Sequence, residues 1–472
     1  VPPINCLPIE LLTLIFTYSP GDVRESYDLD HFVPLRITHV CSLWRTMAID
    51  LPHLWRRFNL RKCLIKGGEH RQLELVALFV QRSRGGVLSI SYQEFAKETG
   101  GESPDSWGTD SAVSVSSDAR TCPCVFRFII DNLASIRELY LSIGREFIDL
   151  LSGCICSSSS LQILDIALLD NVCEQEARHI SRLYSTSSLR MLRVCSLGRQ
   201  LLCRASLEAP WKTLQSVDLR DNPITRLDFM HILRSSPSLR ELHVNTFRPR
   251  SSDAPTLSIE HHSLRTLHVE ADRKDGPLDD IFSVTTLPNL RVFSLRTDFA
   301  QGIDDWPLLD SNVLLKFLSR IRIGLESFYL ESCNIDESTF VSCLRLPQMS
   351  SLTRLSATDL FNEFTKRTIS FLTPDDQKDP VLPHLKALCL RDCVTARDGR
   401  VARMLQTRDA FGIGIVDAEV QFAFGEKHKL DEEALKEHAD LELRSYFESC
   451  FFRHFCDQYV DTGRVSCYRS TC

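Results

Sequence analysis

The chain has 472 residues, 43% of them hydrophobic, so it is long enough to bury a large core and to form two or three domains. Its formal net charge of −7 gives no overall positive field that would attract nucleic acid or an anionic membrane. No apolar run approaches the roughly 18 residues that cross a bilayer, and the first residues lack the charged-then-apolar pattern of a secretory signal.

Residues 1–57 are predicted to form a small all-α domain. Leu7 and Pro8 followed by Glu10 are typical of a helix start, because proline is tolerated in the first turn and an acid is favourable there. Apolar residues at helical spacing predict one helix from Leu7 and another from about Leu35 to Leu51. Such short helices cannot bury these wide apolar faces among themselves. We therefore expect them to dock against a partner, or else to cap the domain that follows.

Residues 58–96 are predicted to be an atypical first repeat that joins this block to the rest of the chain. The pattern gives a short strand at 58–60, an amphipathic helix at 70–84 and a strand at 87–92. The pair Gly85-Gly86 is a strong signal for the end of the helix. Residues 97–120 are rich in Ser, Gly and Asp, which predicts a disordered insertion.

Residues 121–408 repeat one short pattern. Its clearest copy reads Leu214-x-x-Val217-x-Leu219-x-x-Asn222, a short strand followed by a turn. Further copies are separated by steps of 25, 28, 25, 25, 25, 26, 35, 27 and 33 residues. A nearly constant step of this size is the leucine-rich-repeat signature, in which each repeat adds a strand and an outer helix to a solenoid. The copies begin at Ile136, Leu161, Leu189, Leu214, Leu239, Leu264, Leu290, Leu325, Leu352 and Leu385.

Residues 409–472 are predicted to be a C-terminal cap. A final strand at 412–424 and a helix at 431–456 would shield the open edge of the core, as a terminal repeat must do.

The N-terminal block resembles the F-box family. LPIELLTLIF (7–16), HVCSLWRTMA (39–48) and DLPHLW (50–55) follow the F-box pattern, and the form with repeats behind it is similar to F-box families of basidiomycete fungi. The fold class expected is thus α/β, with a small all-α F-box followed by a right-handed leucine-rich-repeat solenoid, or horseshoe.

The resemblance implies the substrate-recognition subunit of a Skp–cullin–F-box ubiquitin ligase. Its F-box would bind the Skp adaptor, and through it a cullin–RING ligase, while the repeats would bind a target protein. The adaptor-binding residues expected on this basis are Leu7, Pro8, Leu11, Ile15, Val40, Cys41 and Trp44.

The outward row of the repeat strands mixes both charge signs with aromatic and histidine side chains. This composition suits a protein or peptide ligand better than a polyanion. The substrate-binding residues predicted on this face are Asp165, Arg193, Asp218, Arg220, His243, His268, Arg296 and Tyr329.

Motifs for catalysis are missing from the sequence. There is no P-loop, nucleophile elbow, H-E-x-x-H or G-x-G-x-x-G pattern. Cys450, Cys456, Cys467 and Cys472 are spaced unlike any standard zinc site. We therefore predict no metal, no cofactor and no enzymatic activity.

The 18 cysteines are predicted to be reduced thiols, since a chain this long and apolar needs no disulfide framework. This favours a cytoplasmic or nuclear protein. The alternative function is a leucine-rich scaffold with no role in a ubiquitin ligase, its N-terminal helices serving only as a cap. An enzyme is the third and weakest hypothesis.

Overall fold

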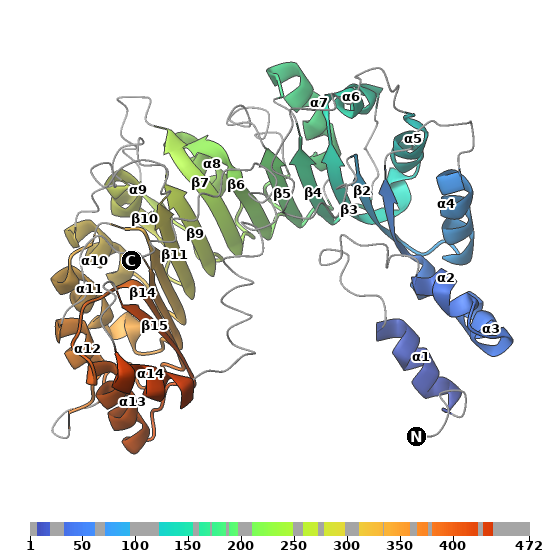
Figure 1. The fold of residues 1–472 in the computed structure, drawn as a ribbon. Helices are drawn as coiled ribbons and strands as arrows, with labels where there is room; N and C mark the ends of the chain where they lie inside the picture. The colour runs from blue at the N-terminus through green and yellow to red at the C-terminus, as the bar shows by residue number, and fades with distance from the viewer. Residues whose placement is uncertain are drawn as a thin grey trace, which may run out of the picture. The chain divides into compact units, whose positions relative to one another are not determined.

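The structure is a computed structural model, and Figure 1 shows its elements in chain order. It describes residues 7–18, 33–61, 71–94, 122–153, 160–169, 172–185, 188–196, 210–248, 258–271, 278–297, 311–333, 335–358, 366–375, 380–422 and 428–437. The predicted insertion at 97–120 lies outside these residues, as do the loop between the first two helices and the four C-terminal cysteines.

The chain divides into two compact units. The first consists of residues up to Ile224 together with Ser235–Leu239 and His243–Asn245. The second consists of the remaining residues from Thr225 onward. The boundary between the units falls inside the range 121–408, for which a solenoid stays a prediction.

The described residues of the N-terminal block form α1 (Ile9–Tyr18), α2 (Val33–Thr38), α3 (Ser42–Asp50) and the 3-10 helix η3 (Pro52–Trp55). The sequence predicted one helix over 35–51, but the chain breaks before Ser42. Cys41 adopts an extended conformation, and its thiol accepts a hydrogen bond from the Trp44 amide, 3.5 Å away. Cys41 therefore caps α3 instead of continuing α2.

In the first unit, parallel strands pair in the order in which they occur in the chain, β1-β2-β3-β4-β5-β6. Helices follow most strands, so this unit is α/β. Its elements after η3 are β1 (Arg57–Arg61), α4 (Arg71–Arg82), β2 (Leu88–Gln93), α5 (Cys124–Asp131), η4 (Leu133–Ser135), β3 (Ile136–Ile143), α6 (Arg145–Ile148), η5 (Asp149–Gly153), β4 (Ile163–Leu168), α7 (Glu174–Tyr184), β5 (Met191–Ser196) and β6 (Ser216–Thr225).

The second unit repeats this construction, with strands in the order β9-β11-β12-β13-β14-β15 and a separate pair β8-β10. The helices α10 to α13 stand side by side along one face of its sheet (Figure 1). Its elements are α8 (Arg226–Ser235), β8 (Ile259–Glu260), β9 (Thr266–Ala271), α9 (Asp279–Val284), β10 (Thr285–Thr286), β11 (Val292–Thr297), α10 (Ser311–Ser319), β12 (Ser327–Glu331), α11 (Glu337–Leu344), η8 (Pro347–Met349), β13 (Arg354–Thr358), α12 (Lys366–Leu372), β14 (Ala387–Val394), α13 (Arg400–Ala410), β15 (Asp417–Phe422) and α14 (Lys429–Glu437), while β7 (Glu241–Arg248) is divided between the units.

All ten strands predicted from the repeat are strands in the structure, and their pattern leucines are buried. One boundary differs. The sequence predicted a turn at Asn222, but β6 remains extended as far as Thr225. The Thr225 amide donates to the Asp228 carboxylate at 2.9 Å, and the Asp228 amide donates back to the Thr225 hydroxyl at 3.1 Å. This reciprocal cap begins α8 and sets where the strand ends.

The core of the second unit contains a run of phenylalanines between sheet and helices. Phe282 lies 4.9 Å from Phe317 between ring centroids, and Phe293 stacks on Phe328 at 6.1 Å. Each of these rings is at most 1% exposed. Their contacts link β11 and β12 to α9 and α10, so each added strand and helix extends the same core.

Among the residues described, no helix has the length and apolar character of a membrane span. The nine described cysteines are free thiols. Burial raises the pKa of the Cys343 thiol to about 12 and that of Cys389 to about 11, so both stay protonated at neutral pH.

Asp336 caps the start of α11. Its carboxylate accepts the Thr339 amide at 2.9 Å, and hydrogen bonds from Ser338 and Thr339 lower the pKa of Asp336 to about 2. We expect Asp336→Ala to reduce the free energy of unfolding by about 1 kcal/mol at pH 7. Because the folded-state pKa is depressed, this contribution is present above the unfolded value of 3.8 and is lost as the pH falls through about 2.

Urea denaturation of the wild type, Asp336→Ala and Asp336→Asn at pH 7 and pH 2 measures this effect. Asn retains a side-chain oxygen for capping but does not titrate, so it is the matched control. An Ala deficit of the same size at both pH values would contradict the assignment of the cap to the ionised carboxylate.

Candidate functional site

The N-terminal helices bury one face against each other. Leu12 and Phe16 of α1 are each 1% exposed, and the Phe16 ring lies 4.9 Å from the Trp44 ring of α3 in an edge-to-face contact. The Thr17 hydroxyl lies 2.9 Å from His53 of η3. Contacts from α1 to both α3 and η3 thus fix its orientation.

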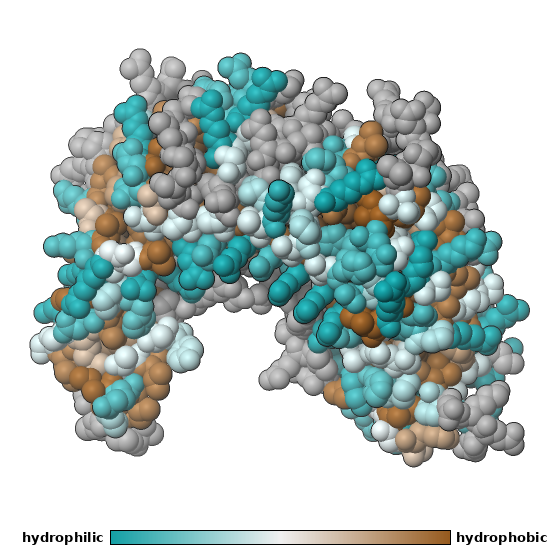
Figure 2. Space-filling model, turned by 180° about the vertical axis from the view of Figure 1, so that it is seen from behind, coloured by the Kyte–Doolittle hydropathy of each residue, from teal (hydrophilic) through white to brown (hydrophobic). Residues whose placement is uncertain are grey.

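The opposite face of the same helices is apolar and uncovered. Seven of the thirteen exposed large apolar side chains of the described chain lie in α1 and in the segment from Val40 to Leu43. Figure 2 shows apolar side chains reaching the surface over these helices, at the lower left of the view. Such a concentration marks an interaction surface, because monomeric proteins rarely expose contiguous apolar patches. The apolar face comprises Ile9 (54% exposed), Leu11 (47%), Leu14 (50%), Ile15 (42%), Tyr18 (81%), Val40 (56%) and Leu43 (45%).

The seven adaptor-binding residues predicted from the sequence are all at least partly exposed. Pro8, Leu11, Ile15 and Val40 are exposed, whereas Leu7, Cys41 and Trp44 are half-buried. Their role in binding stays a prediction. The half-buried positions also have structural work, since Cys41 caps α3 and Trp44 packs on Phe16.

Four members of the apolar face were not among the adaptor-binding residues predicted from the sequence, namely Ile9, Leu14, Tyr18 and Leu43. Three of them lie next to a residue that was, since Ile9 follows Pro8, Leu14 precedes Ile15 and Leu43 precedes Trp44. Helical spacing would have placed Leu14 and Tyr18 outward, but it puts Ile9 on the same side as Leu12 and Phe16, so the exposure of Ile9 was not predictable from the spacing.

Residues 4–61 match the F-box-like family model. The chain carries an F-box-like domain. No curated protein matches the chain significantly.

The F-box-like domain is joined to the sheet by Trp55. This side chain is fully buried, its indole N–H donates to the Ala48 carbonyl at 2.7 Å, and its ring lies 5.0 Å from Phe79 of α4. The Arg82 guanidinium covers the ring at 4.3 Å. One side chain therefore holds α3 and η3 of the F-box-like domain against the first helix behind it.

Behind the F-box-like domain, charged side chains form a ladder across adjacent strands of the first unit. Asp165, Arg193 and Asp218 occupy directly paired positions on β4, β5 and β6. Arg193 lies 3.4 Å from the Asp165 carboxylate and 3.6 Å from that of Asp218. Asp218 also accepts from Arg220 at 2.7 Å and 3.0 Å. Four predicted substrate-binding residues thus come together, but they pair with one another.

Asp218 has the strongest electrostatic perturbation in this ladder. Burial alone would raise the pKa of its carboxyl, but Arg220, His243 and Arg193 together hold the pKa far below its usual range. Asp218 is only 8% exposed. It is therefore a permanently charged anchor for the surrounding arginines rather than a group that exchanges protons.

His243 is half-buried, belongs to the first unit and lies near enough to Asp218 to stabilise its charge, whereas the other three predicted substrate-binding residues lie in the second unit. His268 is half-buried, and Arg296 lies 3.4 Å from Glu331 and 4.0 Å from Glu270. Tyr329 requires a correction, because it clusters with Ala387 and Cys389 and is only 4% exposed. Its position in the strand predicted an outward side chain, but the neighbouring strands cover it.

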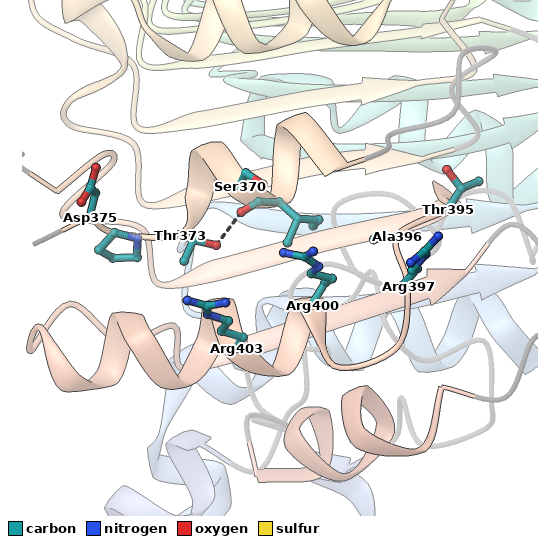
Figure 3. Close-up of a pocket in the computed structure, with 10 residues that line it drawn as sticks. Ser370, Thr373, Asp375, Thr395, Ala396, Arg397, Arg400 and Arg403 are labelled. Atoms are coloured by element: carbon teal, nitrogen blue, oxygen red, sulfur yellow. Dashed lines mark hydrogen bonds between the residues drawn. The ribbon is translucent and has the colours of Figure 1, made fainter.

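A cavity of about 650 Å³ lies between α12 and α13 of the second unit (Figure 3). Its lining includes Arg397, Arg400 and Arg403, with Ser370 and Thr373 opposite. In Figure 3, Arg400 and Arg403 extend from α13 toward Thr373, while Arg397 lies beside Thr395 at the other end. These residues had no predicted role, although the recurrence of arginine at 397, 400 and 403 is visible in the sequence.

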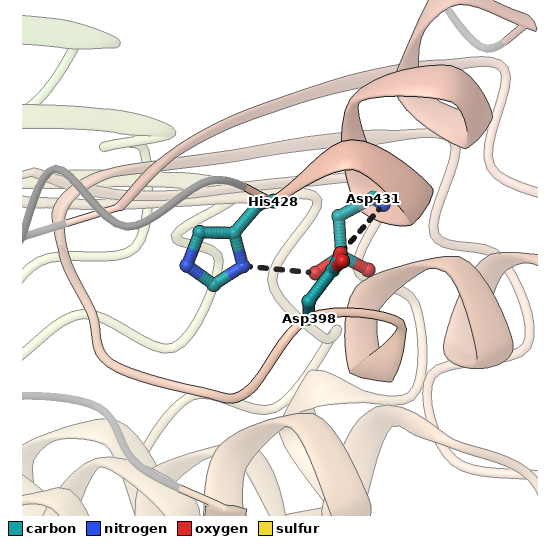
Figure 4. Close-up of side chains that lie close together, drawn as sticks. All are labelled: Asp398, His428 and Asp431. Carbon is teal, nitrogen blue, oxygen red and sulfur yellow. Dashed lines mark hydrogen bonds and ion pairs between the residues drawn. The ribbon is translucent and has the colours of Figure 1, made fainter.

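Asp398, His428 and Asp431 form the one group of potential metal ligands among the described residues (Figure 4). Their donor atoms lie within 4.8 Å of one another. Asp431 accepts the Ala402 amide at 2.8 Å, and Asp398 accepts the Leu430 and Asp431 amides at 3.1 and 3.2 Å. These bonds cap the starts of α13 and α14, so the cluster has a structural role and the absence of a metal stays a prediction.

Proposed function

We propose that this chain is the substrate-recognition subunit of a Skp–cullin–F-box ubiquitin ligase, with the F-box-like domain binding the Skp adaptor and the α/β units binding a target protein. The match of residues 4–61 to the F-box-like family supports this role. The observation that carries it is the apolar face of α1 and Val40–Leu43, which nothing in the described chain covers.

The size of this face is adequate for a stable complex. Fully burying a large apolar side chain contributes about 1.5–3 kcal/mol. Because the seven side chains of the apolar face are on average about half exposed, covering all of them contributes roughly 6–11 kcal/mol. This is of the same order as the cost of association, about 4–15 kcal/mol.

In this role the chain makes and breaks no covalent bond. It would raise the local concentration of a target lysine near a ubiquitin-charged enzyme, which is catalysis by proximity. The parallel strands are proposed to be leucine-rich repeats, and the protein is placed in the cytoplasm or nucleus, where its thiols stay reduced.

The alternative is a scaffold whose N-terminal helices serve only as a cap. It requires those helices to bury their apolar surface against the α/β unit behind them. Trp55 does pack on α4 in this way. The exposed residues of α1 do not, and they favour the adaptor-binding role.

Calorimetric titration of the full chain with a purified Skp adaptor tests the proposal. We expect Ile15→Asp/Val40→Asp to weaken binding by at least about 100-fold, because each substitution replaces an apolar side chain that the adaptor would bury in the complex by a carboxylate. Leu227→Asp/Ile323→Asp introduces the same charges at side chains that are 54% and 46% exposed elsewhere, and should bind normally. A folded wild-type chain that does not bind the adaptor would refute the proposal.

A further inference from the structure

The cavity between α12 and α13 is lined by three arginines. Arg400 and Arg403 are three residues apart in the first turn of α13, which places them on neighbouring positions, and Arg397 lies in the loop before this helix. All three side chains are exposed. Within the described part of the chain, none of the three guanidinium groups forms an ion pair or a hydrogen bond.

This arrangement contrasts with arginines elsewhere in the protein. Arg193 and Arg296 lie between carboxylates, and Arg391 makes a two-point contact with Glu419 at 2.8 and 2.6 Å. The chain as a whole is acidic, with a net charge of −7. A general excess of basic residues therefore does not explain the three arginines at this cavity. Like charges three residues apart repel, and cations are unfavourable near a helix N-terminus.

The other lining groups suit an oxyanion. Ser370, Thr373 and Thr395 bring hydroxyl groups to the cavity, and Asp375 is the one acid among the described lining residues. A neighbouring cavity of about 730 Å³ shares Ser370, Thr373 and Asp375 and adds Arg345 and Arg367. Arginines therefore outnumber acids in both cavities.

Arg408 of α13 fixes the position of the backbone at the end of α12, next to the cavity. This side chain is fully buried, and it donates to the carbonyls of Leu372 at 3.1 Å, Val381 at 3.0 Å and Leu382 at 2.7 Å. Leu372 ends α12, so Arg408 ties the two helices that flank the cavity together. The site is consequently preformed.

We propose that this cavity binds a small molecule carrying two or more phosphate groups. The planar guanidinium group pairs with phosphate oxygens at two points, which gives arginine its preference for this group. Arg397 lies at one end of the cavity, and Arg400 and Arg403 lie nearer the other (Figure 3), so a single phosphate would not engage all three. A volume of about 650 Å³ is in the range of small-molecule sites.

The test is calorimetric titration of the full chain with inorganic tripolyphosphate at constant ionic strength. We expect Arg400→Gln/Arg403→Gln to weaken tripolyphosphate binding by at least about 100-fold, because charge-assisted hydrogen bonds are lost at two positions. Arg234→Gln/Arg265→Gln removes the same charge from two exposed arginines outside the cavity and should leave the affinity unchanged.

Three results would overturn the assignment. They are the absence of tripolyphosphate binding by the wild type, equal binding of citrate, which carries carboxylates instead of phosphates, and equal binding of orthophosphate. The inference goes beyond the proposed ligase role and does not rest on it. Arg400→Gln/Arg403→Gln should bind the Skp adaptor as the wild type does, so failure of one proposal leaves the other intact.

Discussion

Replacing Trp55 with alanine is expected to lower the free energy of unfolding of the first unit by about 3–5 kcal/mol. The indole is fully buried, contacts Phe79 edge-to-face and lies under the Arg82 guanidinium. Alanine would leave a cavity between the F-box-like domain and α4, and it would remove the shorter of the two hydrogen bonds to the Ala48 carbonyl, which also accepts the Leu51 amide at 3.4 Å. Hydrogen exchange should then show faster opening of α3, η3 and α4 together.

Trp55→Phe separates the two contributions. Phenylalanine keeps an aromatic ring against Phe79 but has no N–H for the Ala48 carbonyl, so we expect it to cost less than alanine. Urea denaturation followed by circular dichroism compares the three proteins. If Trp55→Ala lost less than about 1 kcal/mol, the F-box-like domain would not depend on this side chain for its attachment.

Arg408→Ala is expected to destabilise the second unit by about 4 kcal/mol. The buried guanidinium donates to three backbone carbonyls, of which Leu382 also accepts the Leu385 amide at 3.1 Å. The carbonyls of Leu372 and Val381 would lose their side-chain donor, and each buried acceptor left without a donor costs about 1–3 kcal/mol. Burial lowers the pKa of Arg408 to about 10, which still leaves it charged at pH 7. The desolvation of that charge is recovered on mutation and offsets part of the loss.

The control is Arg403→Ala, which truncates an exposed arginine on the same helix and should change the free energy of unfolding by no more than about 0.5 kcal/mol. Arg408→Met refills most of the space without restoring the donors, so it measures the hydrogen bonds apart from the packing. Equal stability of Arg408→Met and the wild type would show that the three carbonyls do not need the guanidinium. The change is measured by urea denaturation.

The strands were predictable because their signal is local. Leucines at fixed spacing fix both the buried face and the register, and each strand of the repeat begins within a few residues of its pattern. The break before α3 was not predictable from apolar spacing, because it depends on the Cys41 thiol accepting a backbone amide. The same limit applies to β6, whose end is set by the cap between Thr225 and Asp228.

The candidate surfaces were predictable only in part. Alternation along a strand indicates which side chains face outward, but it does not indicate what lies over them. Tyr329 is covered by its neighbours, and Asp218 is enclosed not only by Arg220, two residues further on, but also by Arg193 and His243 from other strands. The arginines at 397, 400 and 403 gave a readable signal, yet the cavity they line needs α12, which comes from the preceding repeat.

The pairing of strands in chain order has a consequence for how the protein is made. Within each unit, nearly every strand finds its partner in the next stretch of chain, 25 to 35 residues away. A sheet built this way needs no distant segment to close it, so the loop-closure entropy is small at every step. As the chain leaves the ribosome, each new strand and helix can add to the part already folded. The F-box-like domain and its Trp55 joint are then complete while the second unit is still being synthesised.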